Sequence, residues 1–257
     1  MALTVLDHVD KGRIKLSTML EVEPREMNPS GPVGEEFFYP GIAFSVHNLL
    51  DPMITRSDNT ATDVLYRAVG GPPAVAAHLQ AMGATGIRVS RTIRDLLIVL
   101  YGLPPLSDDQ SVMGYMRALP PDELATVRAR AYAPNPAYSD DPRDQATPSG
   151  MLALLGRIWH AEGVSVAARD LLLPIMQRTT TGLRRIRGRL PPGVTVADKT
   201  GGACGTTNDV GFVTLPGGRG TVALAIYVKE SPLPNTGRED VIADIARLVY
   251  DYYVVTS

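Results

Sequence analysis

Apolar residues recur at helical spacing through the first two-thirds of the chain, where prolines and glycines separate one segment from the next. Residues 60–69 are followed by two glycines, while residues 72–82 begin with prolines and are followed by Gly83. Glycine favours the position after a helix, and proline is tolerated in the first turn. We therefore predict two consecutive helices in these ranges.

A second pair of helices is expected further along the chain. Thr147 and Pro148 form a capping residue followed by a first-turn proline. Ser165 is expected to cap the next helix, which runs to about residue 178. Between these caps, helical spacing predicts one buried apolar face, made of Met151, Leu154, Leu155, Ile158 and Trp159.

The last third of the chain changes character. Residues 194–201, 208–216 and 221–229 are rich in β-branched residues and are joined by turn residues such as PGGRG. A helix is predicted at about 237–253, with one apolar face formed by Val241, Ile245, Leu248 and Tyr252. Strands followed by a covering helix predict an antiparallel sheet with helices packed on it.

The run from Val222 to Val228 is apolar on both faces, which is typical of a central strand covered on both sides. Three strands and one helix can hardly enclose such a strand. The pattern therefore predicts further sheet material at the N-terminus. The alternative is an edge strand covered by a partner chain.

Composition narrows the function. The 257 residues fit one large domain or two small ones. A formal net charge of −2 provides no basic surface, so no nucleic-acid partner is expected. The single cysteine, Cys204, allows no internal disulfide, and the four histidines lack metal-ligand spacing, so no metal or other cofactor is expected. No apolar run approaches the roughly 18 residues of a membrane span, and the first residues do not read as a secretory leader.

Two short polar motifs carry the candidate chemistry. Ser57-Asp58-Asn59 stands in MITRSDNTATD, just before the first predicted helix, and Lys199-Thr200-Gly201 stands in ADKTG, followed by GTTND. Alone, the first motif is an ordinary helix cap and the second a strand ending in a glycine turn. Together and in these contexts they resemble the second and third signatures of the penicillin-recognising serine hydrolases, class A β-lactamases and penicillin-binding proteins.

The resemblance implies an active site between the two motifs. Ser57 would pass a proton to the leaving β-lactam nitrogen, and Lys199 would supply positive charge near the substrate carboxylate. These two are the expected catalytic residues. Asp58 is expected to be structural, tying its loop to neighbouring segments.

Four further residues are expected to bind substrate. Asn59 would hydrogen-bond the amide of the substrate side chain, and Thr200 would offer its hydroxyl to the carboxylate. Gly201 would let the backbone approach the ligand closely, and Gly202 would donate one N–H to the oxyanion.

The segment NPAYSDDPRDQATPSGM resembles the end of the class A Ω-loop. Arg143 and Asp144 match the family's Arg-Asp pair, in which the aspartate braces the loop by an ion pair. Asn135 matches the asparagine that holds the hydrolytic water, although Asn135-Pro136 is equally well explained as a turn.

One residue of this loop departs from the family. Counting back from Asp144 places Ala131 where relatives have the glutamate that activates the deacylating water. We expect this carboxylate to be absent, unless Asp140 or Asp141 replaces it from another part of the loop.

The nucleophile signature departs as well. No serine of the chain has a lysine three residues later, so Ser-x-x-Lys is missing. VLDHVDKGRIKL resembles the end of the nucleophile helix, which would place the serine a few residues ahead of Met1. Two interpretations remain: the chain is truncated before the motif, or it is a natural pseudoenzyme. Intact Ser57, Asn59 and Lys199 favour truncation, and the chain as written is expected to be inactive.

Two other residues were weighed for the site. Cys204 falls near the expected cleft, but no histidine pairing supports a thiol nucleophile. Arg238, which opens the last helix, is a candidate second contact for an anion, although a solvated arginine is the more ordinary interpretation.

The implied fold is α+β. A helical domain over 1–178 carries the SDN motif and the Ω-loop, and an α/β domain over 179–257 carries the KTG strand, with N-terminal strands missing. The expected function is β-lactam hydrolysis through a serine acyl-enzyme. The alternatives are a slowly deacylating penicillin-binding or D-Ala-D-Ala peptidase-like protein and a non-catalytic binding protein. The resemblance implies a small-molecule partner, either a β-lactam or a peptidoglycan-peptide-like substrate. The resemblance also implies a periplasmic or secreted location.

Overall fold

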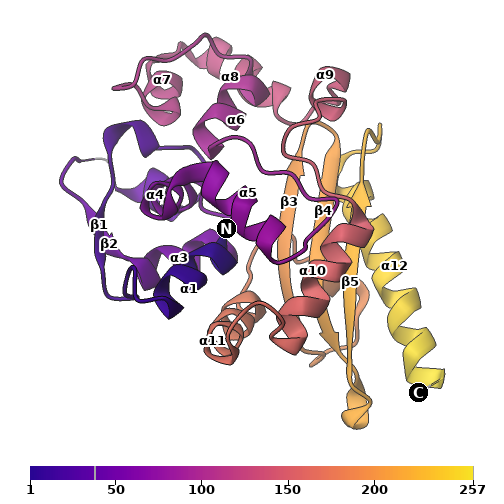
Figure 1. The fold of residues 1–257 in the computed structure, drawn as a ribbon. Helices are drawn as coiled ribbons and strands as arrows, with labels where there is room; N and C mark the ends of the chain where they lie inside the picture. Colours follow the sequence, from indigo (N-terminus) through magenta and orange to yellow (C-terminus); the bar gives the residue numbers. More distant parts are fainter. Residues whose placement is uncertain (38, 257) are drawn as a thin grey trace.

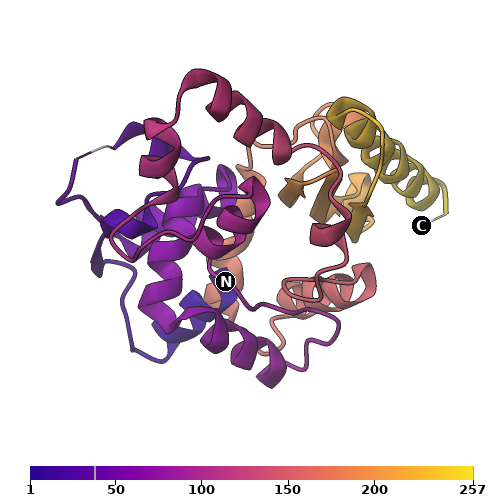
Figure 2. The same cartoon turned by 90° about the horizontal axis from the view of Figure 1, so that it is seen from above.

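The computed structural model describes residues 1–37 and 39–256, which form a helical part beside a small sheet (Figures 1 and 2). The helices preceding the sheet are α1 (Ala2–Asp10), α2 (Pro32–Glu36), α3 (Val46–Thr55), α4 (Asn59–Val69), α5 (Gly71–Ala81), α6 (Ile93–Tyr101), α7 (Val112–Ala118), α8 (Pro121–Arg130), α9 (Pro136–Ser139), α10 (Pro148–His160) and α11 (Val166–Gln177). Strands β1 (Met19–Glu21) and β2 (Ala43–Ser45) form a short antiparallel pair among them.

The main sheet comes from the last third of the chain. Strands β3 (Val196–Ala203), β4 (Thr206–Thr214) and β5 (Thr221–Val228) lie in that order and are antiparallel throughout. Helix α12 (Asn235–Thr256) packs on one face, and α10 and α11 pack on the other (Figure 1). The predicted α+β class, with an antiparallel sheet flanked by helices, is confirmed.

The predicted helix boundaries hold because their capping residues act as expected. Asp58 accepts a hydrogen bond from the N–H of Ala61 at the start of α4, which ends at Gly70 in the left-handed conformation. Thr147 caps α10 and Ser165 caps α11 in the same way.

The apolar run in β5 has a helix on each face. Leu224 and Ile226 pack against α12, and Ala223 packs against the core beneath α10. Helix α10 lies across the second face (Figure 1), so α12 does not cover the sheet alone; the further N-terminal strands stay a prediction. Among the described residues, β5 pairs only with β4.

The prediction for the apolar face of α12 was also wrong. Val241, Ile245, Leu248 and Tyr252 are exposed, by 37%, 40%, 71% and 61% of their surfaces. A second apolar side faces inward instead: Ile242, Ala246 and Tyr250 pack in one core with residues of the sheet, and Ala243 is buried as well. The small side chain of Ala246 lets the helix axis approach the strands closely.

Trp159 is a further correction. It is 38% exposed rather than part of the core, although its ring lies 5.3 Å from that of Phe212 on β4. The indole thus packs from α10 over the central strand of the sheet.

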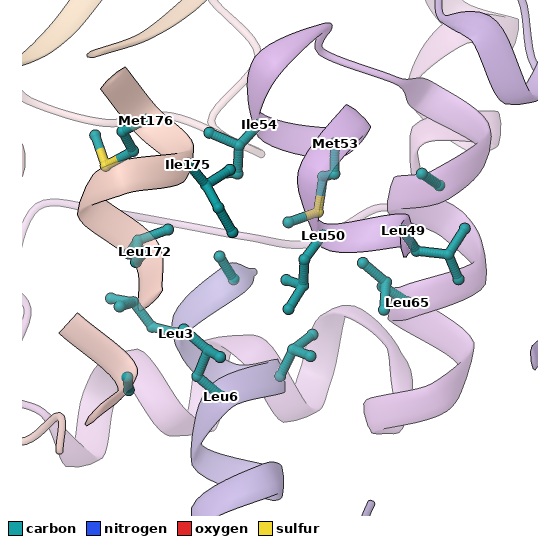
Figure 3. Close-up of a cluster of buried hydrophobic side chains, with 14 of the residues drawn as sticks. Leu3, Leu6, Leu49, Leu50, Met53, Ile54, Leu65, Leu172, Ile175 and Met176 are labelled. Carbon is teal, nitrogen blue, oxygen red and sulfur yellow. The ribbon is translucent and has the colours of Figure 1, made fainter. Parts of the chain in front are cut away.

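The largest core lies among α1, α3, α4 and α11, as Figure 3 shows. Ala197 and Phe212 of the sheet belong to the same cluster, so the helical part and the sheet share one core. The division at residues 178 and 179 therefore stays a prediction. No helix among the described residues is long and apolar enough to cross a membrane.

Candidate active site

Ser57 lies in the tight connection between α3 and α4. Its φ of +53° is in the left-handed region, which is costly for a serine and is common at functional positions. The neighbouring carboxylate fixes this turn: Asp58 is fully buried and also accepts a hydrogen bond from the N–H of Val33 at 2.7 Å. Gly31 packs so closely on Asp58 that a Cβ would lie 2.5 Å from its Cα. Asp58 thus has the structural role that the sequence predicted.

The tertiary fold brings Ser57 to Lys199 on β3. The ammonium group of Lys199 donates to Ser57 Oγ at 2.8 Å and to the carbonyl of Thr200 at 2.7 Å. These residues are 142 positions apart, so the two motifs meet in one site, as predicted.

Burial changes the pKa of Lys199 and so the pH range in which it is charged. It lowers the pKa of Lys199 to about 8, against the opposing effect of Asp209. Burial, together with the nearby Asp198, raises the pKa of Asp209 to about 8. Arg187 pairs with Asp198 and holds that carboxylate behind the strand. At neutral pH Lys199 keeps its positive charge toward the cleft.

Next to Ser57 lies a pocket of about 160 Å³. Thr200, Gly201 and Gly202 line it together with Arg185 and Arg238. Among the described residues that line it, none is an aspartate or a glutamate. The pocket therefore suits an anion rather than a cation.

Arg185 is a site residue that sequence reasoning missed. Its guanidinium donates to the carbonyls of Gly201 and Asn208, both at 2.9 Å, and pairs with Glu239 at 3.2 Å. Thr181, also missed, shares a 2.5 Å hydrogen bond with the hydroxyl of Thr200. No motif or residue spacing in the sequence marks Arg185 or Thr181, because the segment that carries them comes close to β3 only in the folded chain.

Gly182 explains how this segment approaches the strand. Its φ is +57°, and a Cβ there would lie 2.7 Å from Thr200 Cγ2. Only glycine accepts both the conformation and the contact.

Arg238 corrects the ordinary interpretation offered for it. It is 5% exposed rather than solvated, and it donates to Thr207 Oγ1 at 2.9 Å and to the carbonyl of Leu233 at 2.6 Å. Arg185 and Arg238 thus both line the pocket although their side chains are largely buried.

Gly202 lies on the open edge of β3. Along an antiparallel strand, the main-chain groups of alternate residues point to the same side. The carbonyls of Asp198 and Thr200 accept side-chain hydrogen bonds on the side away from β4. By this alternation, the N–H of Gly202 faces the same open side.

Asn59 is not brought into the pocket. Its side-chain amide donates to the carbonyl of Pro29 at 2.7 Å, and it does not line the pocket that holds Ser57. Its contact with a substrate amide stays a prediction.

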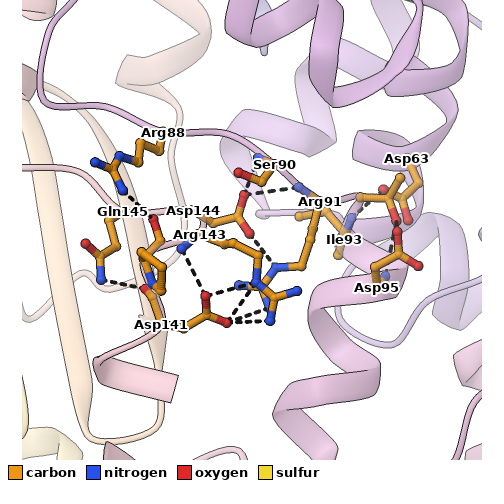
Figure 4. A network of polar contacts seen from close by, with 12 residues as sticks. Asp63, Arg88, Ser90, Arg91, Ile93, Asp95, Asp141, Arg143, Asp144 and Gln145 are labelled. Carbon is orange, nitrogen blue, oxygen red and sulfur yellow. Dashed lines mark hydrogen bonds and ion pairs between the residues drawn. The ribbon is translucent and has the colours of Figure 1, made fainter. Parts of the chain in front are cut away.

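The ion pair expected of Asp144 is formed with Arg91 (Figure 4). The two atoms joined, Arg91 Nε and Asp144 Oδ2, lie 2.5 Å apart, and the carboxylate also accepts from the N–H of Ser90 at 2.6 Å. Arg143 pairs instead with Asp141 at 2.7 Å. Asp144 therefore braces a long excursion, residues 92–143, that contains α6 to α9.

The other loop residues are placed as follows. Asn135 caps α9 and does not line the pocket beside Ser57, so its role in holding water stays a prediction. Ala131 ends α8 and does line that pocket. Asp141 lines a separate cavity of about 630 Å³ that Lys199 also faces. Its ion pair with Arg143 holds the pKa of Asp141 well below its usual range, which weakens it as a base.

A second buried carboxylate, Asp63, was not singled out from the sequence. It accepts hydrogen bonds from the N–H groups of Ile93 and Arg94 at 2.7 and 2.8 Å and so fixes the start of α6. The nearest signal was its place one turn after the SDN motif.

Cys204 is fully buried, and burial raises the pKa of its thiol. It packs in the small core of the 92–143 excursion, so it does not act as a nucleophile. The described residues contain no cluster of His, Cys, Asp and Glu that could hold a metal ion.

Comparison with known proteins gives consistent matches. A family model described as the β-lactamase enzyme family matches residues 1–253. The chain is 27% identical to β-lactamase VEB-1 of Pseudomonas aeruginosa, over 99% of this chain and 75% of that protein. It is 28% identical to the extended-spectrum β-lactamase PER-1 of the same organism, over 98% and 72%. The crystal structure of TLA-3 extended-spectrum β-lactamase superposes with a TM-score of 0.77 at 28% identity, over 98% of this chain and 81% of that one.

Proposed function

The chain belongs to the β-lactamase enzyme family, and we propose that its cleft between α4 and β3 binds β-lactams by their carboxylate. The 2.8 Å hydrogen bond between Lys199 and Ser57 carries this proposal. It joins a cation, which suits a carboxylate, to a hydroxyl that can relay a proton to a departing nitrogen. In the serine hydrolases of this family these are the roles of the two motifs.

The rest of the pocket supports carboxylate binding. Thr200 presents a hydroxyl on the same strand as Lys199, and Thr181 holds that hydroxyl in place. Arg185 and Arg238 add positive charge without a free carboxylate in the lining. Gly202 offers its N–H to the β-lactam carbonyl further along the strand.

The covalent step requires a group that this sequence does not provide. No Ser-x-x-Lys occurs in the 257 residues, and Ser57 already receives a hydrogen bond from Lys199. Its position beside Lys199, in a left-handed turn, supports a role as proton relay rather than as nucleophile. We propose that the chain as written binds β-lactams without forming an acyl-enzyme.

The test uses the purified chain. NMR titration should detect benzylpenicillin binding, which Lys199→Ala should abolish, while nitrocefin should not be hydrolysed and fluorescent penicillin should leave no label. Lys11→Ala, which removes an exposed lysine of the same charge that lines neither the pocket beside Ser57 nor the cavity that Lys199 faces, is the matched control and should bind normally. Stoichiometric labelling, or binding that is indifferent to Lys199, contradicts the proposal.

A second function is favoured by one observation. Ala131 lines the pocket where a family glutamate was expected, and no carboxylate replaces it among the described lining residues. This supports a slowly deacylating, penicillin-binding or D-Ala-D-Ala peptidase-like protein. A non-catalytic binding protein is favoured by the missing Ser-x-x-Lys. The acyl-enzyme lifetime is measured by mass spectrometry on a form engineered to carry Ser-x-x-Lys. A long-lived acyl-enzyme supports the slowly deacylating protein, the absence of an acyl-enzyme supports the binding protein, and a short-lived one supports fast hydrolysis.

Two broader proposals rest on the family alone. We place the protein in the periplasm or outside the cell, where relatives would meet β-lactams and contribute to antibiotic resistance. Fractionation of cells producing the protein tests the location. We also keep the division into a helical domain over 1–178 and an α/β domain over 179–257 as a proposal.

A further inference from the structure

We propose that Tyr132 determines specificity by contacting the acylamino substituent of a bound β-lactam with its aromatic ring. The inference rests on the proposed function of the same cleft. Tyr132 follows α8 and lines the pocket that holds Ser57 and Thr200. It is 71% exposed, so its ring stands free at the pocket rim without an intramolecular burial role.

The order of the functional groups in a β-lactam determines how the ligand is oriented along β3. In a penicillin, the carboxylate and the acylamino group lie on opposite sides of the β-lactam carbonyl. With the carboxylate at Lys199 and Thr200 and the carbonyl at the N–H of Gly202, the acylamino group continues toward Ala203 and Cys204. These two residues line the same pocket as Tyr132.

Two contacts hold the tyrosine at this end of the strand. The N–H of Cys204 donates to the carbonyl of Ala131 at 2.8 Å, which ties the β3–β4 turn to the residue before Tyr132. On the other side, Gly205 fits against Pro134 so closely that a Cβ would lie 3.0 Å from it. The Cys204 side chain is buried in the small core of the excursion.

The backbone of this wall is therefore fixed from both sides while the ring itself remains accessible. An aromatic side chain on a fixed backbone contributes to binding by stacking on another ring, because only its own side-chain torsions have to be ordered. The ligand class that this wall favours is a β-lactam whose acylamino group carries an aromatic ring. A β-lactam without that group should not sense Tyr132.

The experiment compares two ligands on the purified chain by NMR titration. Benzylpenicillin carries an aromatic acylamino group, whereas 6-aminopenicillanic acid keeps the same nucleus and carboxylate but has a free amine. Tyr132→Ala should weaken benzylpenicillin by about 3- to 10-fold, the range of an aromatic pair, and leave 6-aminopenicillanic acid within about 2-fold. Tyr132→Phe keeps the ring and should retain affinity for both.

Tyr252→Ala removes a comparably exposed tyrosine from α12 and should change neither affinity. Equal weakening of both ligands by Tyr132→Ala, or no change in either, overturns the role of Tyr132 while leaving the proposed function standing. Loss of benzylpenicillin binding in Tyr132→Phe overturns the ring contact. If the unchanged chain binds neither ligand, the proposed function fails and this inference fails with it. Thermal midpoints of the variants show that each is folded.

Discussion

The guanidinium of Arg91 and the carboxylate of Asp144, 53 residues apart, close the excursion that carries α6 to α9. The Arg91 side chain is only 8% exposed, and that of Asp144 is 19% exposed. The pair fixes both ends of the segment whose far end, at Ala131 and Tyr132, reaches the candidate active site. The Arg91–Asp144 pair thus closes the segment that supplies one wall of the cleft.

Breaking this pair should destabilise the protein. Asp144→Asn leaves a buried guanidinium short of one partner, which typically costs about 3–5 kcal/mol when the pair is fully buried and less here, because Asp141 remains beside Arg91. We expect a loss of about 2–3 kcal/mol in the free energy of urea unfolding. Asp251→Asn breaks the exposed pair with Arg247 and should cost at most about 0.5 kcal/mol. Equal effects of the two variants would show that Asp144 braces nothing.

Binding of β-lactams should weaken as the pH rises through about 8. The lowered pKa of Lys199 means that its charge is present below pH 8 and lost above it. The carboxylate of the ligand stays ionised throughout, so only the protein side changes. Dissociation constants from NMR titration at pH 6.5, 7.5 and 9 measure the effect. Lys199→Arg, which stays charged across this range, should flatten the profile if it binds at all.

Asp209 should make the protein less stable as the pH rises from about 4 to about 8. Because its pKa is raised to about 8 in the folded state, the native protein holds a proton that the unfolded chain has released. The unfolded state then binds fewer protons, so the free energy of unfolding falls with pH across this window.

The variant Asp209→Asn removes this titration. Its free energy of unfolding should fall less steeply between pH 5 and pH 7 than that of the unchanged chain, with urea titrations at several pH values as the measurement. Asp63, whose pKa burial raises to about 6, titrates in both proteins and cancels in the comparison. Parallel slopes would show that Asp209 is ionised in the native state.

Gly182→Ala should affect both stability and binding. The substitution places a methyl group 2.7 Å from Thr200 Cγ2 in a backbone conformation that costs alanine roughly 1–2 kcal/mol. Gly193→Ala has the same kind of backbone strain, with a φ of +84°, but meets no atom within 4 Å. We expect the first variant to lose more stability and to bind benzylpenicillin more weakly, and the second to lose stability alone. Similar affinities in the two would argue against Thr200 as a carboxylate contact.

Local patterns in the sequence were enough to predict the elements and the two motifs. Asp58, Thr147 and Ser165 cap helices because capping depends on a few neighbouring residues. The meeting of Ser57 with Lys199 followed from the resemblance to the family, which carries that long-range information in its motifs.

Contacts between distant segments were decided only by the tertiary structure. The partner of Asp144 is Arg91 rather than its neighbour Arg143, because the excursion between them folds into helices that return the chain to its start. Arg185 enters the site because its segment packs on β3. Helix α12 has two apolar sides, and close packing on the sheet selected the one with alanines. The pattern of residues along the sequence determines which side chains can be buried or charged. Which residue a charged side chain pairs with, and which side of a helix is buried, depend on how many elements pack together.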